Sequence, residues 1–322
     1  MPQLDVFNGD ADGLCALLQL RLHEPCPGAG LVTGVKRDIR LLDRLRETEH
    51  ASITVLDISL DVNRKALLHL LDQDNSIIYL DHHFAGEVPQ HPRLTLHLDP
   101  AAASCTSLIV DALLGGRYRP WALVGAFGDN LHERAQELAG SLPLTVEEID
   151  RLRELGTLLN YNGYGEKIED LHIDPAQLFQ TMLPFANPLD FWAQAPIVPQ
   201  LRQGHQDDLG RALALSPLFE TPAVRAFQLP DTDWARRVGG SYAHHLAREQ
   251  QDLAHAVLQP MRDGSWRVSV RAPRSRPAGA DLLCRRYPTG GGRTAAAGIN
   301  ALPPALLPAF LQDFRRSFPH NA

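Results

Sequence analysis

Short apolar segments alternate with amphipathic segments along the first 130 residues of the chain. The apolar runs predict buried strands, and apolar positions that repeat every three to four residues predict the helices between them. The expected strands cover residues 5–7, 31–35, 53–56 and 77–80, and the expected helices cover residues 13–22, 40–47 and 63–72. Because strands that alternate with helices form parallel sheets, this pattern predicts an α/β fold.

The pattern is less regular after residue 140. A capping box at Thr145–Glu148 predicts a helix that runs to about residue 159, and a loop is expected at residues 160–165. Residues 184–235 are rich in proline and poorly periodic, which is typical of a connection between domains. Beyond it we expect a long helix at residues 240–258, a strand at 266–271 and a last helix after Pro304.

The composition is that of a globular protein. The chain has 322 residues, of which 44% are hydrophobic and 21% are charged. Its four cysteines form no CxxC pair, so the sequence offers neither a zinc finger nor a redox motif. The chain start lacks a basic segment followed by an apolar one, and no stretch approaches 18 apolar residues. We therefore expect a cytoplasmic protein that does not span a membrane.

The charge is distributed unevenly. The net charge is −7, but residues 1–200 carry 15 Lys and Arg against 28 Asp and Glu, whereas residues 201–322 carry 16 against 10. An acidic chain is a poor ligand for long duplex nucleic acid, because such binding depends on many cations. All 16 cations of the second part are arginine, which indicates either phosphate binding or an arginine-rich coding bias.

Acidic and histidine residues follow several of the apolar runs. Asp10 and Asp12 follow the first expected strand, Asp57 the third and Asp81-His82-His83 the fourth, and Asp129 comes after a later apolar run. The carboxyl ends of parallel strands lie at one edge of a sheet, so we expect these side chains to converge. Clustered carboxylates repel one another unless cations neutralise them, which indicates a pair of divalent metal ions. Mixed Asp and His ligands favour a transition metal such as Mn²⁺.

The order and spacing of these four motifs resemble the DHH family of phosphoesterases. The end of the chain is similar to the DHHA1 substrate domain, through residues 268–271 and the run Gly290-Gly291-Gly292-Arg293 with the residues that follow it to Gly298. The resemblance implies a parallel-sheet DHH metal domain at residues 1–185, a connecting segment at 186–236 and a smaller α/β DHHA1 domain at 237–322.

The resemblance also implies roles for the motif residues. The five that would ligate two divalent ions, Mn²⁺ or alternatively Mg²⁺, are Asp10, Asp12, Asp57, His82 and Asp129. Asp57 would bridge the ions and Asp81 would orient His82, while His83 would face the scissile phosphate or complete a metal shell. Many nanoRNase-like members have a histidine where this chain has Val6, so one metal site is a ligand short. Asn8 either supplies an amide oxygen there or is a turn residue that caps the strand.

In the second domain the resemblance places substrate contacts on Arg271, on the backbone of Gly290, Gly291 and Gly292, and on Arg293. Glycines let backbone N–H groups approach an anion closely, and we expect Arg293 to begin a helix beside its positive end. Tyr161 and Tyr164 either stack on a base or pin their loop to the core.

The expected function is that of a two-metal phosphodiesterase. Its substrate would be a short linear oligonucleotide, such as the dinucleotide pGpG, which it would cleave to nucleoside monophosphates. Two alternatives are a phosphatase acting on a 3',5'-bisphosphorylated nucleotide, pyrophosphate or polyphosphate, and a catalytically weak nucleotide-binding regulator. The expected partner is thus a short oligonucleotide or nucleotide, with no long duplex nucleic acid and no membrane, and the chain is compatible with a homodimer.

Overall fold

The computed structural model describes residues 1–319 and separates the chain into two compact units, Met1–Gln203 and Gly204–Ala322. The first unit contains a five-stranded sheet with the order β2-β1-β3-β4-β5, in which every neighbouring pair is parallel. Its strands are β1 Gln3–Phe7, β2 Gly30–Val32, β3 Ser52–Leu56, β4 Ser76–Asp81 and β5 Leu94–Leu98. The predicted α/β fold with a parallel sheet is confirmed. The edge strand β5 was not predicted.

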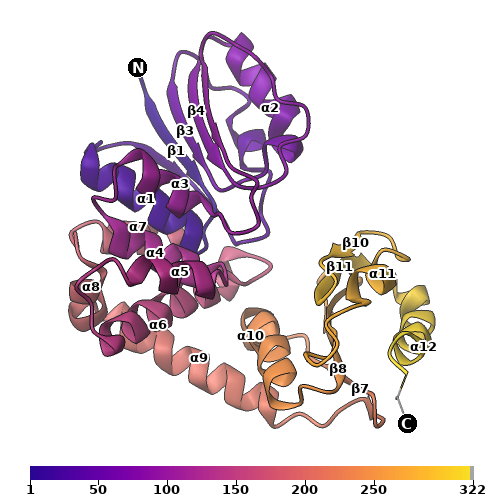
Figure 1. Ribbon diagram of the computed structural model, residues 1–322. Helices are drawn as coiled ribbons and strands as arrows, with labels where there is room; N and C mark the ends of the chain where they lie inside the picture. Colours follow the sequence, from indigo (N-terminus) through magenta and orange to yellow (C-terminus); the bar gives the residue numbers. More distant parts are fainter. Residues whose placement is uncertain (320–322) are drawn as a thin grey trace. The chain divides into compact units, whose positions relative to one another are not determined.

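Alternate residues of the strands enter two separate hydrophobic cores. Phe7, Leu56 and Leu80 pack against α1 (Ala11–His23), α3 (Thr106–Leu113) and α4 (Arg119–Gly128) on one face of the sheet. Val6 and Val55 face the other way, toward α2 (Leu60–Asp72) and the 3₁₀ helix η1 (Leu41–Leu45). Figure 1 shows α1 and α3 on one side of the strands and α2 on the other. Both faces of the sheet are therefore covered, as expected for a parallel sheet.

The rest of the first unit is helical. The remaining elements are α5 His132–Ala139, α6 Val146–Gly163, η2 Ile168–Asp170, α7 Pro175–Met182, α8 Pro188–Gln194 and α9 Ile197–Leu213, which continues into the second unit. The capping box of α6 is present: Thr145 Oγ1 accepts from the Glu148 N–H, and the Glu148 carboxylate accepts from the Thr145 N–H. The helix continues past its expected end to Gly163, so most of the loop expected at residues 160–165 is helix.

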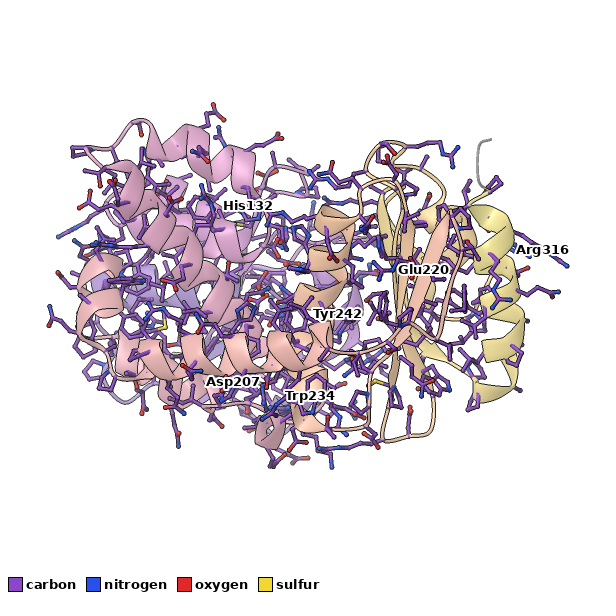
Figure 2. The ribbon with its side chains drawn as sticks, turned by 90° about the horizontal axis from the view of Figure 1, so that it is seen from below. His132, Asp207, Glu220, Trp234, Tyr242 and Arg316 are labelled. Carbon is purple, nitrogen blue, oxygen red and sulfur yellow. The ribbon has the colours of Figure 1, made fainter. Side chains whose placement is uncertain are left out.

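The second unit has a six-stranded sheet with the order β10-β11-β9-β8-β7-β6. Its elements are β6 Phe219–Glu220, β7 Val224–Gln228, α10 Asp233–Glu249, β8 Ala254–Pro260, β9 Trp266–Arg271, α11 Ala280–Cys284, β10 Gly290–Gly292, β11 Ala296–Leu302, η3 Pro304–Leu306 and α12 Leu307–Ser317. Tyr242 of α10, labelled in Figure 2, packs edge-on against Phe227 with ring centroids 5.4 Å apart. The helix thus buries one face of the sheet.

Two expectations for this part of the chain differ from the structure. The helix expected at residues 240–258 begins earlier and ends at Glu249, and its second half is instead the buried strand β8. The expected connection at residues 186–236 contains regular structure, namely α8, α9, β6 and β7, and β7 is part of the second sheet. No helix within residues 1–319 is long and apolar enough to cross a membrane.

Candidate metal centre

The motif residues of the first unit come together at the carboxyl edge of its sheet. Asp10 and Asp12 follow β1, Asp57 follows β3, and Asp81 is the last residue of β4. Asp129 reaches the same place from the C-terminal cap of α4, not from a strand end. The parallel sheet therefore explains the positions of all these residues except Asp129, which a helix supplies.

Three carboxylates surround one nitrogen of His82. Its Nε2 atom lies 3.5 Å from Asp57 Oδ1, 3.8 Å from Asp129 Oδ2 and 4.0 Å from Asp12 Oδ2. Donor atoms bound about 2.0–2.2 Å from one ion lie about 3 to 4 Å apart, so this spacing suits a shared divalent ion. The donor set of one imidazole and three carboxylates suits a transition metal. Residues Asp57, His82 and His83 also have ligand atoms within 4.8 Å of one another.

Asp12 is fixed by the start of α3. Its Oδ2 accepts a hydrogen bond from the Thr106 N–H at 2.7 Å, and its Oδ1 accepts one from the Ser107 N–H at 2.8 Å. The first N–H groups of a helix have no partner within the helix and carry partial positive charge, so they stabilise a carboxylate. Asp12 is almost fully buried, and these bonds hold its negative charge in place.

The surroundings of Asp57 strongly disfavour the charged form of its carboxyl group. Burial, together with the charges of Asp12 and Asp10, raises the pKa of its carboxyl well above the usual range. Its backbone has a positive φ of 60°, which is uncommon for a residue with a side chain and is often found at functional sites. Thr106 Oγ1 donates a hydrogen bond to Asp57 Oδ1 at 3.1 Å. A charged carboxylate at this position requires a nearby cation, which a divalent ion would supply.

Asp10 contacts a lysine that the motifs did not reveal. Its Oδ1 caps α1 by accepting from the Asp12 and Gly13 N–H groups, and its Oδ2 lies 2.5 Å from Lys36 Nζ. Burial alone would raise the pKa of the Asp10 carboxyl, but the Lys36 ammonium holds it below its usual value. Burial would likewise lower the pKa of Lys36, but Asp10 raises it well above the usual value.

Lys36 is also bound to other parts of the site. Its Nζ donates to Asn160 Oδ1 at 3.0 Å and lies 3.5 Å from Asp129 Oδ1. Its backbone N–H donates to the Gly163 carbonyl at 2.8 Å. Sequence reasoning missed this residue, although a signal existed: Lys36 is one of three lysines in the chain and comes shortly after β2, a parallel neighbour of β1.

Asn8 positions Lys36. Its side-chain amide donates to the Lys36 carbonyl at 3.1 Å, and its Oδ1 accepts from the Asp10 N–H at 3.3 Å. Of the two interpretations of Asn8, these bonds favour the turn residue. Gly9 allows the chain to approach closely here, because a Cβ atom on it would lie 2.0 Å from the Gly34 carbonyl oxygen.

His83, not His82, is the hydrogen-bonding partner of Asp81. The His83 Nδ1 atom lies 2.7 Å from Asp81 Oδ1, and Asp81 Oδ2 accepts from the Leu60 N–H at 3.3 Å. The expectation that Asp81 orients His82 is therefore wrong in the choice of histidine. Burial would lower the pKa of His83, but the Asp81 carboxylate raises it above its usual value. The His83 side chain is 40% exposed.

The expected substrate contacts of the second unit lie on β9 and β10, which are separated in the sheet by β11. Arg271 ends β9 and pairs with His255 of β8 and with Ala296 of β11. Gly290–Gly292 is the strand β10, and a tight turn in which Arg293 and Ala296 exchange backbone hydrogen bonds leads into β11. The expectation that Arg293 begins a helix is wrong, because a glycine-rich strand and a turn stand there. Arg293 is nevertheless exposed.

Tyr161 and Tyr164 differ in their surroundings. Tyr161 is buried in α6 and its hydroxyl lies 2.7 Å from His172 Nε2, so it packs within the first unit. The ring of Tyr164 lies 5.7 Å from Lys36 Nζ.

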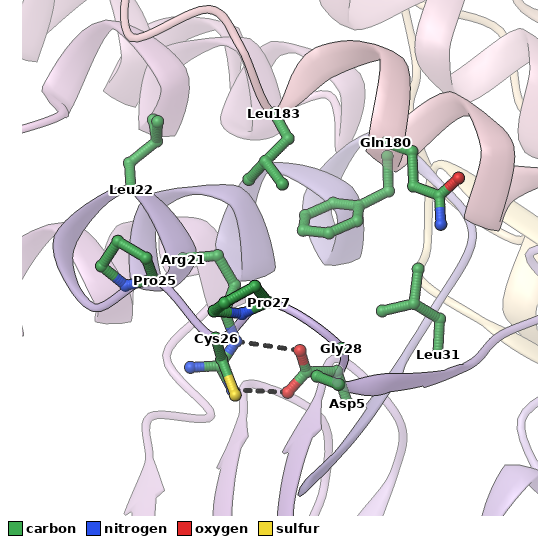
Figure 3. A pocket seen from close by; sticks show the side chains of 12 residues that line it. Asp5, Arg21, Leu22, Pro25, Cys26, Pro27, Gly28, Leu31, Gln180 and Leu183 are labelled. Carbon is green, nitrogen blue, oxygen red and sulfur yellow. Dashed lines mark hydrogen bonds and ion pairs between the residues drawn. The ribbon is translucent and has the colours of Figure 1, made fainter.

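A pocket of about 350 Å³ is present elsewhere in the first unit. It lies between the end of α1, the segment 25–29 and α7, and an ion pair between Arg21 and Asp5 forms part of its wall (Figure 3). None of the motif residues lines this pocket.

Solved structures with the same fold were identified by comparison. No protein-family model matches the sequence, and no curated protein matches it. The exonuclease RecJ bound to manganese superimposes with a TM-score of 0.59 and 17% identity, over 98% of this chain and 89% of that chain. RecJ of Thermus thermophilus, in complex with Mn²⁺, gives 0.55 and 18% over 97% of this chain and 51% of that chain.

The pGpG-specific phosphodiesterase PggH from Vibrio cholerae is a third similar structure. It superimposes with a TM-score of 0.51 and 16% identity, over 97% of this chain and 100% of that chain. The chain therefore shares its fold with RecJ and with PggH, and the fold that its motif resemblance implied is confirmed. The similarity extends over 98% of this chain for RecJ and 97% for PggH.

Proposed function

We propose that the chain is a metal-dependent phosphodiesterase that hydrolyses short linear oligonucleotides to nucleoside monophosphates, with dinucleotides such as pGpG as its best substrates. The proposal depends above all on the three carboxylates that converge on His82 Nε2. It is supported by the fold shared with RecJ and with PggH, whose name describes it as specific for pGpG.

The residues around His82 would hold the metal. A bound divalent ion polarises a phosphoryl oxygen and stabilises the charge that develops on it during hydrolysis. Asp12, Asp57, His82 and Asp129 provide one oxygen or nitrogen each, and the amides of α3 keep Asp12 in position. Mn²⁺ is the proposed metal because it accepts both imidazole and carboxylate ligands. Two of the RecJ structures similar to this chain contain manganese.

His83 would act on the substrate. Asp81 binds its Nδ1 atom, which leaves the Nε2 atom for other partners. A protonated histidine within hydrogen-bond reach of a leaving oxygen donates a proton to it as a general acid. We therefore assign His83 the transfer of a proton to the leaving group and Asp81 the orientation of His83.

The charge distribution supports a short substrate. Residues 1–200, which include the whole metal centre, carry a net charge of −13 and offer no continuous basic track for a long strand. In the second unit, Arg271 and the exposed Arg293 are the candidate phosphate contacts. Each phosphate beyond the first few would meet acidic surface or solvent, so binding energy would not grow with length.

Hydrolysis of a graded series of substrates tests this proposal. Purified protein with Mn²⁺ is incubated with 5'-labelled oligonucleotides of two to twenty residues, a 3',5'-bisphosphorylated nucleotide, pyrophosphate and polyphosphate. We expect kcat/KM to be highest for dinucleotides and to fall at least about tenfold by about five nucleotides, since about 1.4 kcal/mol corresponds to one lost contact. A chelator and the Asp129→Asn variant should both abolish turnover.

The matched control is Asp150→Asn, which changes an exposed acid of α6 in the same chemical way. Similar rates on a dinucleotide and a 20-mer would contradict the substrate proposal and favour an exonuclease like RecJ. Turnover of the bisphosphate or of polyphosphate alone would favour a phosphatase. An absence of metal-dependent turnover on every substrate would contradict the enzymatic function itself.

A further inference from the structure

The polar side chains of the metal centre fall into two groups. The first surrounds His82 Nε2 and consists of Asp12, Asp57 and Asp129, at 3.5 to 4.0 Å. The second surrounds Lys36 Nζ and consists of Asp10 at 2.5 Å, Asn160 at 3.0 Å and again Asp129 at 3.5 Å. A metal ion would be the centre of the first group, whereas an ammonium is already the centre of the second.

The oxygen atoms beside Asp10, from Asn160 and Asp129, already surround the Lys36 ammonium. One Asp10 oxygen accepts hydrogen bonds from the Asp12 and Gly13 N–H groups, and the other faces Lys36 Nζ. Four residues before Asp10 stands Val6, whose fully buried side chain packs into the core on the α2 side of the sheet and offers no ligand atom. An ion placed here would depend on Asp57 for a further carboxylate, and the Lys36 ammonium would repel it.

Hydrogen bonds to the backbone of Lys36 fix its position. Its N–H donates to the Gly163 carbonyl and its own carbonyl accepts from the Asn8 side chain, so both ends of its peptide backbone are held. The chain approaches closely at Gly163, where a Cβ atom would make a tight contact of 3.1 Å with the Asp10 Cα atom. The Lys36 side chain is 22% exposed, so the ammonium is fixed inside the site and is not a surface charge.

We propose that the protein binds one divalent ion, at Asp12, Asp57, His82 and Asp129, and that the Lys36 ammonium takes the place of a second ion beside Asp10. The binding of one ion rests on the proposed metal-dependent function. The replacement of a second ion rests on the position of the Lys36 ammonium. It gives Asp57 a single ion to bind instead of two to bridge. It also gives the site one permanent cation that a chelator cannot remove.

Manganese binding without substrate tests the number of ions. The metal-free full-length protein is titrated with Mn²⁺, bound metal is counted by elemental analysis, and the bound ion is recorded by electron paramagnetic resonance. We expect one Mn²⁺ per chain with the spectrum of an isolated ion. Two ions per chain, or the spectrum of an exchange-coupled pair, would overturn the inference and leave the proposed function intact. An absence of bound Mn²⁺ would overturn both.

Two substitutions test the role of Lys36 directly. Lys36→Glu replaces the ammonium with a further carboxylate between Asp10 and Asp129, so we expect it to raise the stoichiometry from one ion to two and to produce a coupled spectrum. Lys65→Met, which changes an exposed lysine of α2, is the control and should stay at one ion. Circular dichroism establishes that each variant is folded. A folded Lys36→Glu protein that still binds a single ion would show that Lys36 does not exclude the second.

Discussion

Asp57→Asn is expected to separate the stability of the metal-free protein from its affinity for metal. The Asp57 carboxylate is buried beside Asp10 and Asp12, and burial together with these charges raises its pKa well above the usual range. Replacing it with a neutral amide removes that repulsion, so the metal-free variant should be more stable than the metal-free wild type at neutral pH. The amide oxygen can still accept from Thr106 Oγ1, and Asn tolerates the positive φ of this position.

The metal should stabilise the wild type much more than the variant. At a Mn²⁺ concentration of about 100 times the dissociation constant, binding stabilises the wild type by about 2.7 kcal/mol. For a unit of the size of Met1–Gln203, that raises Tm by roughly 5 to 11 °C. Loss of one of the four ligands weakens binding by at least about 100-fold, so the same Mn²⁺ concentration should add at most about 0.4 kcal/mol to the variant, or about 1 °C.

Thermal unfolding with and without Mn²⁺ measures both effects. Asp74→Asn is the matched control, because Asp74 also has a positive φ, of 61°, but is exposed and lies away from the motif residues. This control should behave like the wild type. An Asp57→Asn protein that is less stable than the wild type without metal, or that gains as much from Mn²⁺, would contradict the placement of Asp57 at the ion.

The pH dependence of metal-free stability follows from the same residue. The pKa of Asp57 is higher in the folded chain than in the unfolded one, so the folded chain binds more protons between the two values. The wild type should therefore gain stability from this group as pH falls through that range, and Asp57→Asn should lack this gain.

Two further predictions concern the second unit. Arg293→Ala should raise KM for dinucleotides about ten- to a hundredfold, because a charge-assisted contact contributes about 1.5–3 kcal/mol. The control Arg316→Ala, which changes an exposed arginine, should leave KM unchanged. Equal KM values for Arg293→Ala and the wild type would show that Arg293 does not contact the substrate. Burial beside Arg225 lowers the pKa of His255 to about 4, below the 6.5 of an unfolded chain, so stability should fall by about 3 kcal/mol as pH drops from 6.5 to 4. Urea unfolding of the wild type and of His255→Leu across this pH range measures the loss. If the free energy of unfolding changes equally with pH in both proteins, the prediction is contradicted.

The sequence predicts the site well where the fold is regular. Asp10, Asp57 and Asp81 are found together because parallel strands end at one edge of a sheet, a rule that needs only the strand positions. No such rule predicts the hydrogen bonds between Asp12 and the start of α3. They join Asp12 to residues that lie 94 and 95 positions further along the chain. Lys36 was missed because it belongs to none of the motifs, although it follows β2 at the same edge.

The errors in secondary structure have a physical cause. β8 is buried on both faces, so its sequence has no alternation of apolar and polar residues to distinguish it from the helix before it. In contrast, Leu94–Leu98 does alternate, and it forms an edge strand of the sheet. The glycines at 290–292 suggest the approach to a helix from sequence alone, and their antiparallel pairing with residues 297–299 of β11 reveals a strand.

The arrangement of the helix ends explains how four carboxylates can share one site before a metal binds. The N-terminus of α1 stabilises Asp10, and the N-terminus of α3 stabilises Asp12 through two N–H groups. Lys36 neutralises part of the charge of Asp10 and Asp129. Asp57 is the carboxylate with the strongly raised pKa, and the Thr106 hydroxyl donates to it. The protein thus compensates Asp10 and Asp12 with its own groups. Burial raises the pKa of Asp129 despite Lys36, so the charges of Asp57 and Asp129 are the ones that depend on the ion.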